Sequence, residues 1–256
     1  MASRSSRRSG ISYWPTCIDG ATRLRYQRVL SRTEWSVTCA WGGIVARTAA
    51  PDGRDRILDV AARLFYEQGI RAVGMKQIVD EAGTGKSLLY GHFATKDELV
   101  EAYLRRSAAR LGRSAARAQQ AAGDDPGERI VALVTDAGHR ILRPGGRGCP
   151  FRNYLVEFPD AGDEPDTGTG PAAVARRTLG ESRAVVERLA RELAGPAGGA
   201  VLAEQIALIL DGLFARASYR DRGDDEPPVG AVLAAVELTR TLVAQHRAPG
   251  DAPAGG

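Results

Sequence analysis

The sequence predicts an all-α protein. Apolar residues recur at spacings of three and four from Asp52 almost to the end of the chain. Glycine, proline and aspartate interrupt these runs at intervals that suit the ends of helices. No segment alternates apolar and polar residues convincingly enough to indicate a strand.

The first three helical runs are short and are separated by glycines. Gly69 ends the first run, and Gly83 ends the second. After Thr84-Gly85 a third run extends over residues 86–92. Two short helices joined by a glycine-containing turn have the geometry of a helix-turn-helix. The apolar faces of the first two runs consist of Ile57, Leu58, Ala61, Leu64, Phe65, Met75, Ile78, Val79 and Ala82.

The later helices follow from their caps and breaks. Thr95 and Glu98 form a capping box that opens a helix reaching about Gln120. After a break at Gly123–Asp125, a helix with apolar residues between Ile130 and Leu142 ends before a Pro-Gly-Gly sequence, and Pro150 suits the first turn of the next helix. Residues 159–171 are rich in Pro, Gly and Asp and predict a loop. Three longer helices follow, at about 172–194, 199–219 and 228–247.

Composition limits the class of protein. The chain has 256 residues, of which 43% are hydrophobic and 26% charged, as in ordinary soluble globular proteins. No apolar run approaches the roughly 18 residues of a membrane span, so we expect a cytoplasmic protein without a membrane partner. The three cysteines, Cys17, Cys39 and Cys149, lack metal-ligand spacing. We therefore expect neither a metal nor a cofactor.

The N-terminal segment differs from the rest of the chain. Residues 1–50 hold eight Arg against Asp19 and Glu34, and they show no sustained period. We interpret residues 1–50 as a disordered basic arm; an alternative is a mis-assigned start, with translation beginning at the codon read here as Val45. We expect a helix-turn-helix domain at 51–97, a helical ligand-binding and dimerisation domain at 98–247, and a disordered tail at 248–256.

The stretch Gly85-Lys86-Ser87 resembles the end of a phosphate-binding loop. That motif requires a glycine five residues before Gly85, where this chain has Asp80 followed by Glu81. Their carboxylates would repel phosphate oxygens, and the preceding segment has helical spacing where the motif needs a strand. A nucleotide-binding enzyme is therefore disfavoured.

As a helix, residues 86–92 have two distinct faces. Leu89 and Phe93 point toward the preceding helices, whereas Ser87, Leu88 and Gly91 point away. The only lysines of the chain, Lys76, Lys86 and Lys96, all lie within about twenty residues of this segment. Basic residues around a small, mostly apolar outer face are typical of a helix that contacts a DNA groove.

Residues 54–104 resemble the N-terminal domain of the tetracycline-repressor (TetR) family. The resemblance rests on Ile57-Leu58, Leu64-Phe65, Gly69, Ile78, Ala82-Gly83, Lys86, Leu89-Tyr90, His92-Phe93 and Lys96-x-Glu98-Leu99. It implies a homodimeric transcriptional regulator that binds double-stranded DNA at an operator. Matching the family pattern places phosphate contacts on Lys86, Tyr90, His92 and Lys96, and base or near-base contacts on Thr84, Ser87 and Leu88. The chain departs from the pattern at Val73-Gly74, Gly85 and Leu88, which bears on operator affinity and sequence.

A weaker resemblance to the family's ligand-binding domain continues into "GRGCPFRNYLVEFPD" and "AEQIALILDGLFARA". It suggests a pocket wall for an unknown small-molecule effector, formed by Cys149, Phe151, Asn153, Tyr154, Glu157 and Phe158. An ordinary amphipathic helix explains the same pattern. Cys149 also admits a redox role, but one Cys with His139 and no orienting group gives poor support for catalysis, and a buried thiol is favoured.

The wide apolar faces of the last two long helices fit dimerisation, although core packing alone also uses such faces. We predict a regulator, not an enzyme, that represses by occupying a palindromic operator until a small molecule releases it. An activator built on the same parts stays open. The alternative is a small-molecule-binding helical protein whose DNA affinity has weakened.

Overall fold

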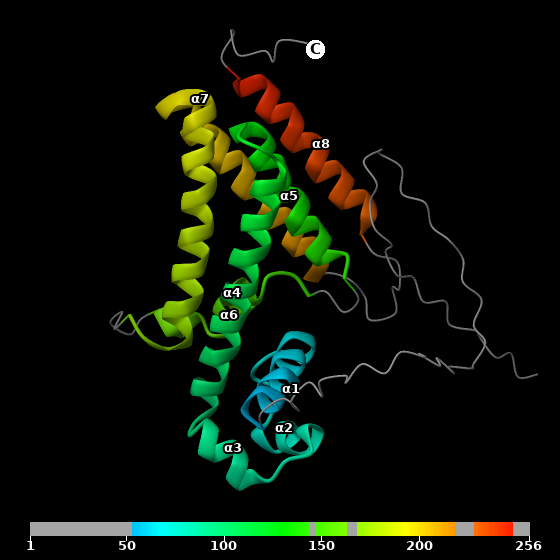
Figure 1. Cartoon of the computed structure of the whole chain (residues 1–256), viewed down its shortest axis with the longest axis vertical. Helices are drawn as coiled ribbons and strands as arrows, with labels where there is room; N and C mark the ends of the chain where they lie inside the picture. The colour runs from blue at the N-terminus through cyan, green and yellow to red at the C-terminus, as the bar shows by residue number, and fades with distance from the viewer. Residues whose placement is uncertain (1–52, 144–146, 163–167, 219–227, 248–256) are drawn as a thin grey trace, which may run out of the picture. The chain divides into compact units, whose positions relative to one another are not determined.

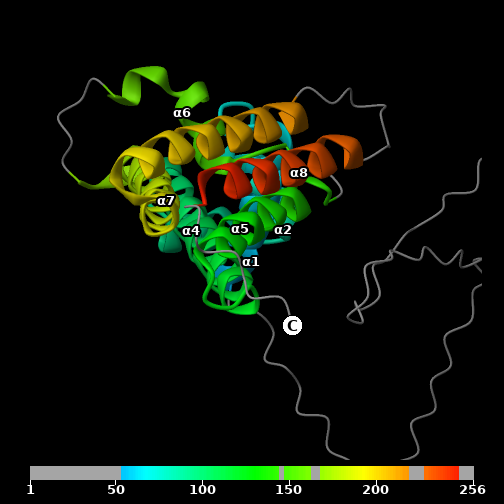
Figure 2. The same cartoon turned by 90° about the horizontal axis from the view of Figure 1, so that it is seen from above.

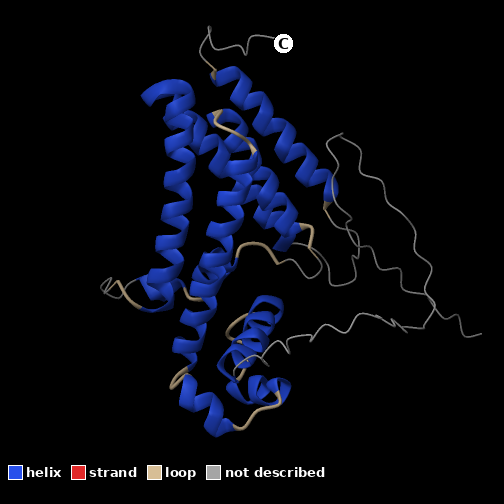
Figure 3. Cartoon of the chain, viewed as in Figure 1, coloured by secondary structure: helices blue, strands red, loops and turns tan. Residues whose placement is uncertain are grey.

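The structure is a computed structural model that describes residues 53–143, 147–162, 168–218 and 228–247. Within these ranges helix is the only regular secondary structure (Figure 3), which confirms the predicted fold class. The predicted arm at 1–50 and tail at 248–256 lie outside the described residues. The chain divides into two compact units, residues 1–48 and 49–256, and every described residue belongs to the second.

Three short helices form the N-terminal part of this unit (Figure 1). Their apolar faces share one core with the start of the long helix α4, and this core continues across the domain boundary predicted after residue 97. That boundary therefore stays a prediction. The bounds are Gly53–Gln68 for α1, Met75–Ala82 for α2, Lys86–His92 for α3 and Lys96–Ala121 for α4.

Side-chain caps fix the starts of α4 and α5. Thr95 Oγ1 accepts the N–H of Glu98 at 3.1 Å, as the capping box predicts. The Glu98 carboxylate reaches the N–H of Ala94 at 2.7 Å instead of that of Thr95. Helix α5 (Pro126–Ile141) begins directly after the predicted break at Gly123–Asp125, because Asp125 caps it and Pro126 suits its first turn.

The C-terminal helices complete the fold. Helix α6 (Pro150–Glu157) is followed by the short 3₁₀ helix η1 (Pro159–Gly162), within the segment predicted as a loop. Helix α7 (Gly170–Ser218) joins two predicted helices across a kink at Gly195, where φ is 70° and Pro196 follows. Helix α8 spans Val229–His246.

Helices α5, α7 and α8 enclose a second core, and α5 and α8 lie side by side (Figure 2). Two glycines of α5 let α8 approach closely. A Cβ atom added at Gly138 would lie 2.4 Å from Cγ1 of Val232, and one at Gly127 would lie 2.6 Å from Cγ1 of Val243. Each valine thus occupies space that any larger residue on α5 would fill.

One described helix, over residues 170–217, is long and apolar enough to cross a membrane by length and composition alone. This differs from the sequence-based expectation, since a high average hydropathy does not need an uninterrupted apolar run. A single such helix is weak support for a membrane span. Here the helix is kinked at Gly195, and its Leu189, Leu202 and Ile206 are buried in the second core.

Candidate functional site

The outer face of α3 is the first candidate site. Leu89 and Phe93 are buried, and α3 packs against the preceding helices α1 and α2, as predicted. Gly83 ends α2 in the left-handed region (φ 60°), and the N–H of Thr84 returns to the carbonyl of Val79 at 3.1 Å. This compact turn directs the opposite face of α3 toward solvent.

Four of the predicted DNA contacts lie exposed on that face. Lys86 and Ser87 are exposed, and Leu88 and Tyr90 retain 41% and 51% of their accessible surface. Leu88 also packs against the start of α1, because a Cβ atom at Gly53 would lie 2.9 Å from its Cδ2. Part of the Leu88 side chain is therefore in contact with α1 and is not available to a DNA groove.

The other three predicted contacts are less accessible. His92 and Thr84 are half-buried, and Thr84 Oγ1 is buried without a hydrogen-bond partner among the described residues. Lys96 is half-buried; burial lowers the pKa of its ammonium, and the nearby carboxylates of Glu157 and Asp97 oppose that shift. The structure thus brings Lys86, Ser87, Leu88 and Tyr90 together on the exposed face of α3.

Neither helix of the motif begins with a side-chain cap. Gly74 precedes α2 and Gly85 precedes α3, and neither position supplies a side-chain hydrogen bond. This matches the departures at Val73-Gly74 and Gly85 seen in the sequence. An N-cap glycine is only a few tenths of a kcal/mol worse than serine or threonine, so the fold tolerates both.

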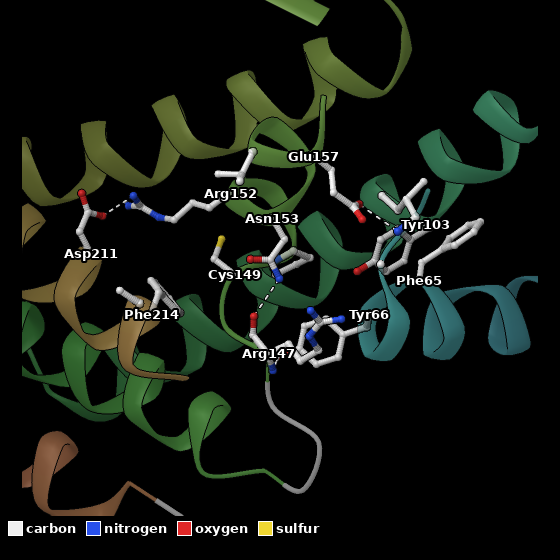
Figure 4. Close-up of a pocket in the computed structure, with 15 residues that line it drawn as sticks. Phe65, Tyr66, Tyr103, Arg147, Cys149, Arg152, Asn153, Glu157, Asp211 and Phe214 are labelled. Atoms are coloured by element: carbon white, nitrogen blue, oxygen red, sulfur yellow. Dashed lines mark hydrogen bonds and ion pairs between the residues drawn. The ribbon is translucent and has the colours of Figure 1, made fainter. Parts of the chain in front are cut away.

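The second candidate site is a cavity of about 420 Å³ (Figure 4). It lies where the end of α1 meets the segment of α6 and the second half of α7. Its volume falls in the range of small-molecule sites, roughly 300–1,000 Å³. The lining residues are Phe65, Tyr66, Gly69, Ile70, Tyr103, Arg147, Cys149, Pro150, Arg152, Asn153, Val156, Glu157, Asp211, Phe214 and Ala215.

Half of the predicted pocket residues line this cavity. Cys149, Asn153 and Glu157 do so. Phe151 and Tyr154 are instead buried in the first core, because they lie on the inner face of α6. Phe158 lies outside the lining, stacked on Tyr154 with ring centroids 4.9 Å apart.

The sequence did not reveal the residues that α1, α4 and α7 contribute. No sequence pattern assigns Tyr66, Tyr103 or Phe214 to a site, and nothing in the sequence pairs α6 with the end of α1. Arg147 and Arg152 flank the predicted pocket residues and introduce positive charge. Their proximity to Cys149 in the sequence was the one feature that could have indicated that they line the cavity.

Polar groups in the cavity are held by specific partners. Arg152 forms an ion pair with Asp211, and its guanidinium lies 5.8 Å from the ring centroid of Phe214. Arg152 Nε is buried without a hydrogen-bond partner among the described residues. Asn153 Nδ2 donates to the carbonyl of Arg147 at 2.8 Å.

Burial determines the protonation of the cavity's weak acids. It raises the pKa of Tyr103, and it raises that of Tyr66 against the opposing hydrogen bond from the Arg147 N–H. Burial also raises the pKa of the Cys149 thiol, although the N–H groups of Arg152 and Phe151 oppose the shift. A protonated, buried thiol is a poor nucleophile, which favours a packing role for Cys149.

Two further observations bear on the predictions. No group of three or more His, Cys, Asp or Glu suited to hold a metal occurs among the described residues. The second half of α7 and helix α8 expose large apolar side chains on the predicted dimerisation helices. These are Val201, Leu208, Leu233 and Leu238, which are 50–70% exposed.

Comparisons with known proteins agree with this arrangement. The model of the family described as "Bacterial regulatory proteins, tetR family" matches residues 57–103, which cover α1 to the start of α4. An uncharacterised HTH-type transcriptional regulator of Mycobacterium tuberculosis is 37% identical over 81 residues. That alignment covers 32% of this chain and only 40% of the relative.

Longer similarities extend beyond the helix-turn-helix. The HTH-type transcriptional regulator BetI of Rhizobium meliloti is 29% identical over 205 residues, covering 78% of this chain and 93% of BetI. The crystal structure of a TetR-family regulator from Streptomyces coelicolor superposes with a TM-score of 0.66 at 24% identity. It covers 76% of this chain and 95% of its own, so the likeness in fold includes the C-terminal helices.

Proposed function

The chain belongs to the TetR family of bacterial regulatory proteins, and from this premise we propose that it is a ligand-responsive DNA-binding transcriptional regulator. The observation that carries the proposal is the exposed face of α3, with Lys86, Ser87, Leu88 and Tyr90 presented by a buried Leu89. The α3 helix enters the major groove, where Lys86 and Tyr90 bind phosphates and Ser87 and Leu88 face the bases. Lys96, His92 and Thr84 join as contacts at the edges of this face.

Repression by occupancy is the mechanism that we propose. Two copies of α3 occupy successive major grooves of a palindromic operator, and a small molecule in the effector domain changes their separation. The cavity beside α6 is the proposed site for that molecule, because it touches both α1 and the C-terminal helices. No step of this cycle requires a reaction, so we propose a regulator without catalytic activity that acts in the cytoplasm.

The homodimer uses the exposed faces of the second half of α7 and of α8. Four large apolar side chains there are at least half exposed in the single chain. Burying them stabilises an association at roughly 25 cal/mol per Å² of apolar surface, before the cost of association. Pairing two subunits also supplies the two recognition helices that a palindrome needs.

A second candidate function is ligand binding with weakened DNA affinity. The uncapped starts of α2 and α3, at Gly74 and Gly85, favour it. Under this alternative the cavity binds a small molecule, but the exposed face of α3 does not bind DNA specifically. The same parts also suit an activator, and a reporter gene under the cognate promoter distinguishes activation from repression.

Lys86→Ala tests the proposed function in a gel-shift titration against the DNA upstream of the gene. Each phosphate contact contributes about −0.9 to the slope of log K against log salt concentration. A dimer loses two such contacts, so we expect a slope shallower by about 1.8 and weaker binding across sequences. Arg117→Ala, an exposed charge on α4, is the matched control.

Specific binding that neither Lys86→Ala nor Tyr90→Ala alters would contradict the proposed contacts. Absence of any specific shift by the wild-type protein, with a small molecule still bound, would favour the second candidate function.

A further inference from the structure

Helix α6 is attached to the end of α1 at two places. The first attachment lies before α6 begins. The Tyr66 hydroxyl donates to the carbonyl of Gly148 at 3.0 Å and accepts the N–H of Arg147 at 2.9 Å. Arg147 Nη1 also donates to the carbonyl of Glu67 at 2.7 Å. Three hydrogen bonds thus hold this end.

The second attachment lies at the last residue of α6. Glu157 Oε2 accepts the N–H of Ile70 at 2.9 Å, just beyond the end of α1 (Figure 4). Among the described residues one hydrogen bond joins the half-buried Glu157 side chain to this segment, and beside it the Arg71 guanidinium lies 4.9 Å from the ring centroid of Phe158. The second attachment therefore has fewer hydrogen bonds than the first.

Gly69 makes this contact possible. Its φ of +91° lies in the left-handed region, which favours glycine. A Cβ atom at Gly69 would also lie 2.4 Å from Glu157 Oε1, so a side chain there would displace the carboxylate from its present position. The glycine that ends α1 therefore also leaves room for the carboxylate to sit against the backbone.

The cavity lies between the two attachments. Tyr66, Gly69 and Ile70 line it from α1, and Arg147 and Glu157 line it from the α6 segment. A molecule in the cavity consequently contacts the groups that fasten α6 to the DNA-binding helices. If the molecule needs more room, the single hydrogen bond of Glu157 is the first to yield.

We propose that Glu157 is a positioning residue for DNA binding: by holding the N–H of Ile70 it fixes the direction in which the helix-turn-helix points, and the cavity's ligand acts by releasing it. This inference rests on the proposed function. Glu157 touches no DNA; it acts through α1, which packs on α2, α3 and α4. The two recognition helices of a dimer must lie one turn of DNA apart. When Glu157 no longer holds the segment after α1, the distance between the two recognition helices varies more widely.

The test compares binding to operators that differ only in the spacing of their half-sites. The probes are duplexes of the footprinted operator with the native spacer and with one base pair added or removed. Glu157→Ala and Glu157→Asp both withdraw the acceptor from Ile70, whereas Glu157→Gln keeps an oxygen that accepts the N–H. Asp160→Ala, an exposed carboxylate in η1, is the matched control. Hydrogen exchange at the Ile70 amide is measured on the same proteins without DNA.

We expect the wild type, Glu157→Gln and Asp160→Ala to favour the native spacer by about tenfold or more. Glu157→Ala and Glu157→Asp should favour it by less than about threefold, with faster exchange at Ile70 and a melting temperature lowered by a few degrees, because the buried Ile70 N–H loses its acceptor. A merely structural role would lower affinity for all three spacers equally.

Undiminished spacing preference in both Glu157→Ala and Glu157→Asp overturns the inference, as does equal loss in Glu157→Gln. Should Glu157→Ala fail to fold, Glu157→Asp decides. If the wild type binds no operator, the proposed function has failed, and the wild-type lanes alone show it.

Discussion

Replacing Gly138 by alanine tests how closely α8 packs on α5. The new Cβ would lie 2.4 Å from Cγ1 of Val232, a separation that real contacts do not show. Gly112→Ala on α4 is the matched control, because its Cβ would meet nothing within 4 Å. Both changes replace glycine by alanine inside a helix, so they share the same gain in helix propensity.

The two variants should differ by the cost of overpacking alone. Alanine stabilises a helix interior by about 0.8–1.0 kcal/mol over glycine, which is the whole effect expected at Gly112. At Gly138 an overpacking cost of about 1–3 kcal/mol opposes that gain. A difference of about 2 kcal/mol between the variants corresponds to melting temperatures about 4–8 °C apart for a chain of this size.

Differential scanning calorimetry measures the two melting temperatures at equal protein concentration. Val232→Ala should remove the clash, so adding Gly138→Ala to Val232→Ala should stabilise the protein by about 0.8–1.0 kcal/mol, as Gly112→Ala does, whereas adding it to the wild type should not. If Gly138→Ala is stabilised as much as Gly112→Ala, α8 does not seat on α5 as described and the reasoning fails.

Two further predictions concern charge and assembly. Burial alone would raise the pKa of Asp125, but hydrogen bonds from Arg247 and the Glu128 N–H lower this pKa overall. The ionised Asp125 carboxylate therefore stabilises the folded protein at neutral pH, and this stabilisation is lost on acidification. Asp125→Asn should therefore lower the free energy of unfolding in denaturant titrations at pH 7 and differ less from wild type at pH 3; an equal difference at both would refute this. Leu208→Glu, at a side chain 70% exposed in the single chain, should convert a dimer into a folded monomer in light-scattering measurements, whereas Val156→Glu, at 80% exposed, should not. A dimer unaffected by Leu208→Glu would place the interface elsewhere.

Local signals predicted most of the fold. Gly69 and Gly83 marked two helix ends correctly, because a left-handed residue after a helix is a property of the residue itself. Thr95 marked the start of α4 correctly, because its side chain accepts the N–H of Glu98 and caps the helix. The break at Gly195 was visible in the sequence, and its non-helical backbone (φ 70°, ψ −177°) separates the two halves of α7.

The candidate cavity was harder to predict, since its walls come from segments far apart in the chain. The sequence correctly indicated that the α6 segment contributes to the cavity. Helical spacing alone did not distinguish the buried Phe151 and Tyr154 from the cavity-lining Asn153 and Glu157. That distinction depends on which helices cover each face of α6. The contribution of Tyr66 arises from a contact across 82 residues, which no local pattern encodes.

The second half of α7 has two different neighbours. Its Asp211, Phe214 and Ala215 line the cavity, whereas Val201 and Leu208, about four and two turns earlier on the face that carries Ala215, are exposed to solvent where the proposed partner subunit would pack. A helix with its side chains is only about 10–12 Å thick. In the proposed dimer, the ligand sites of the two subunits would therefore be separated by little more than a pair of helices in contact. A ligand titration of the dimer therefore measures whether filling one site changes the affinity of the other: a Hill coefficient different from one would show that the two sites are coupled.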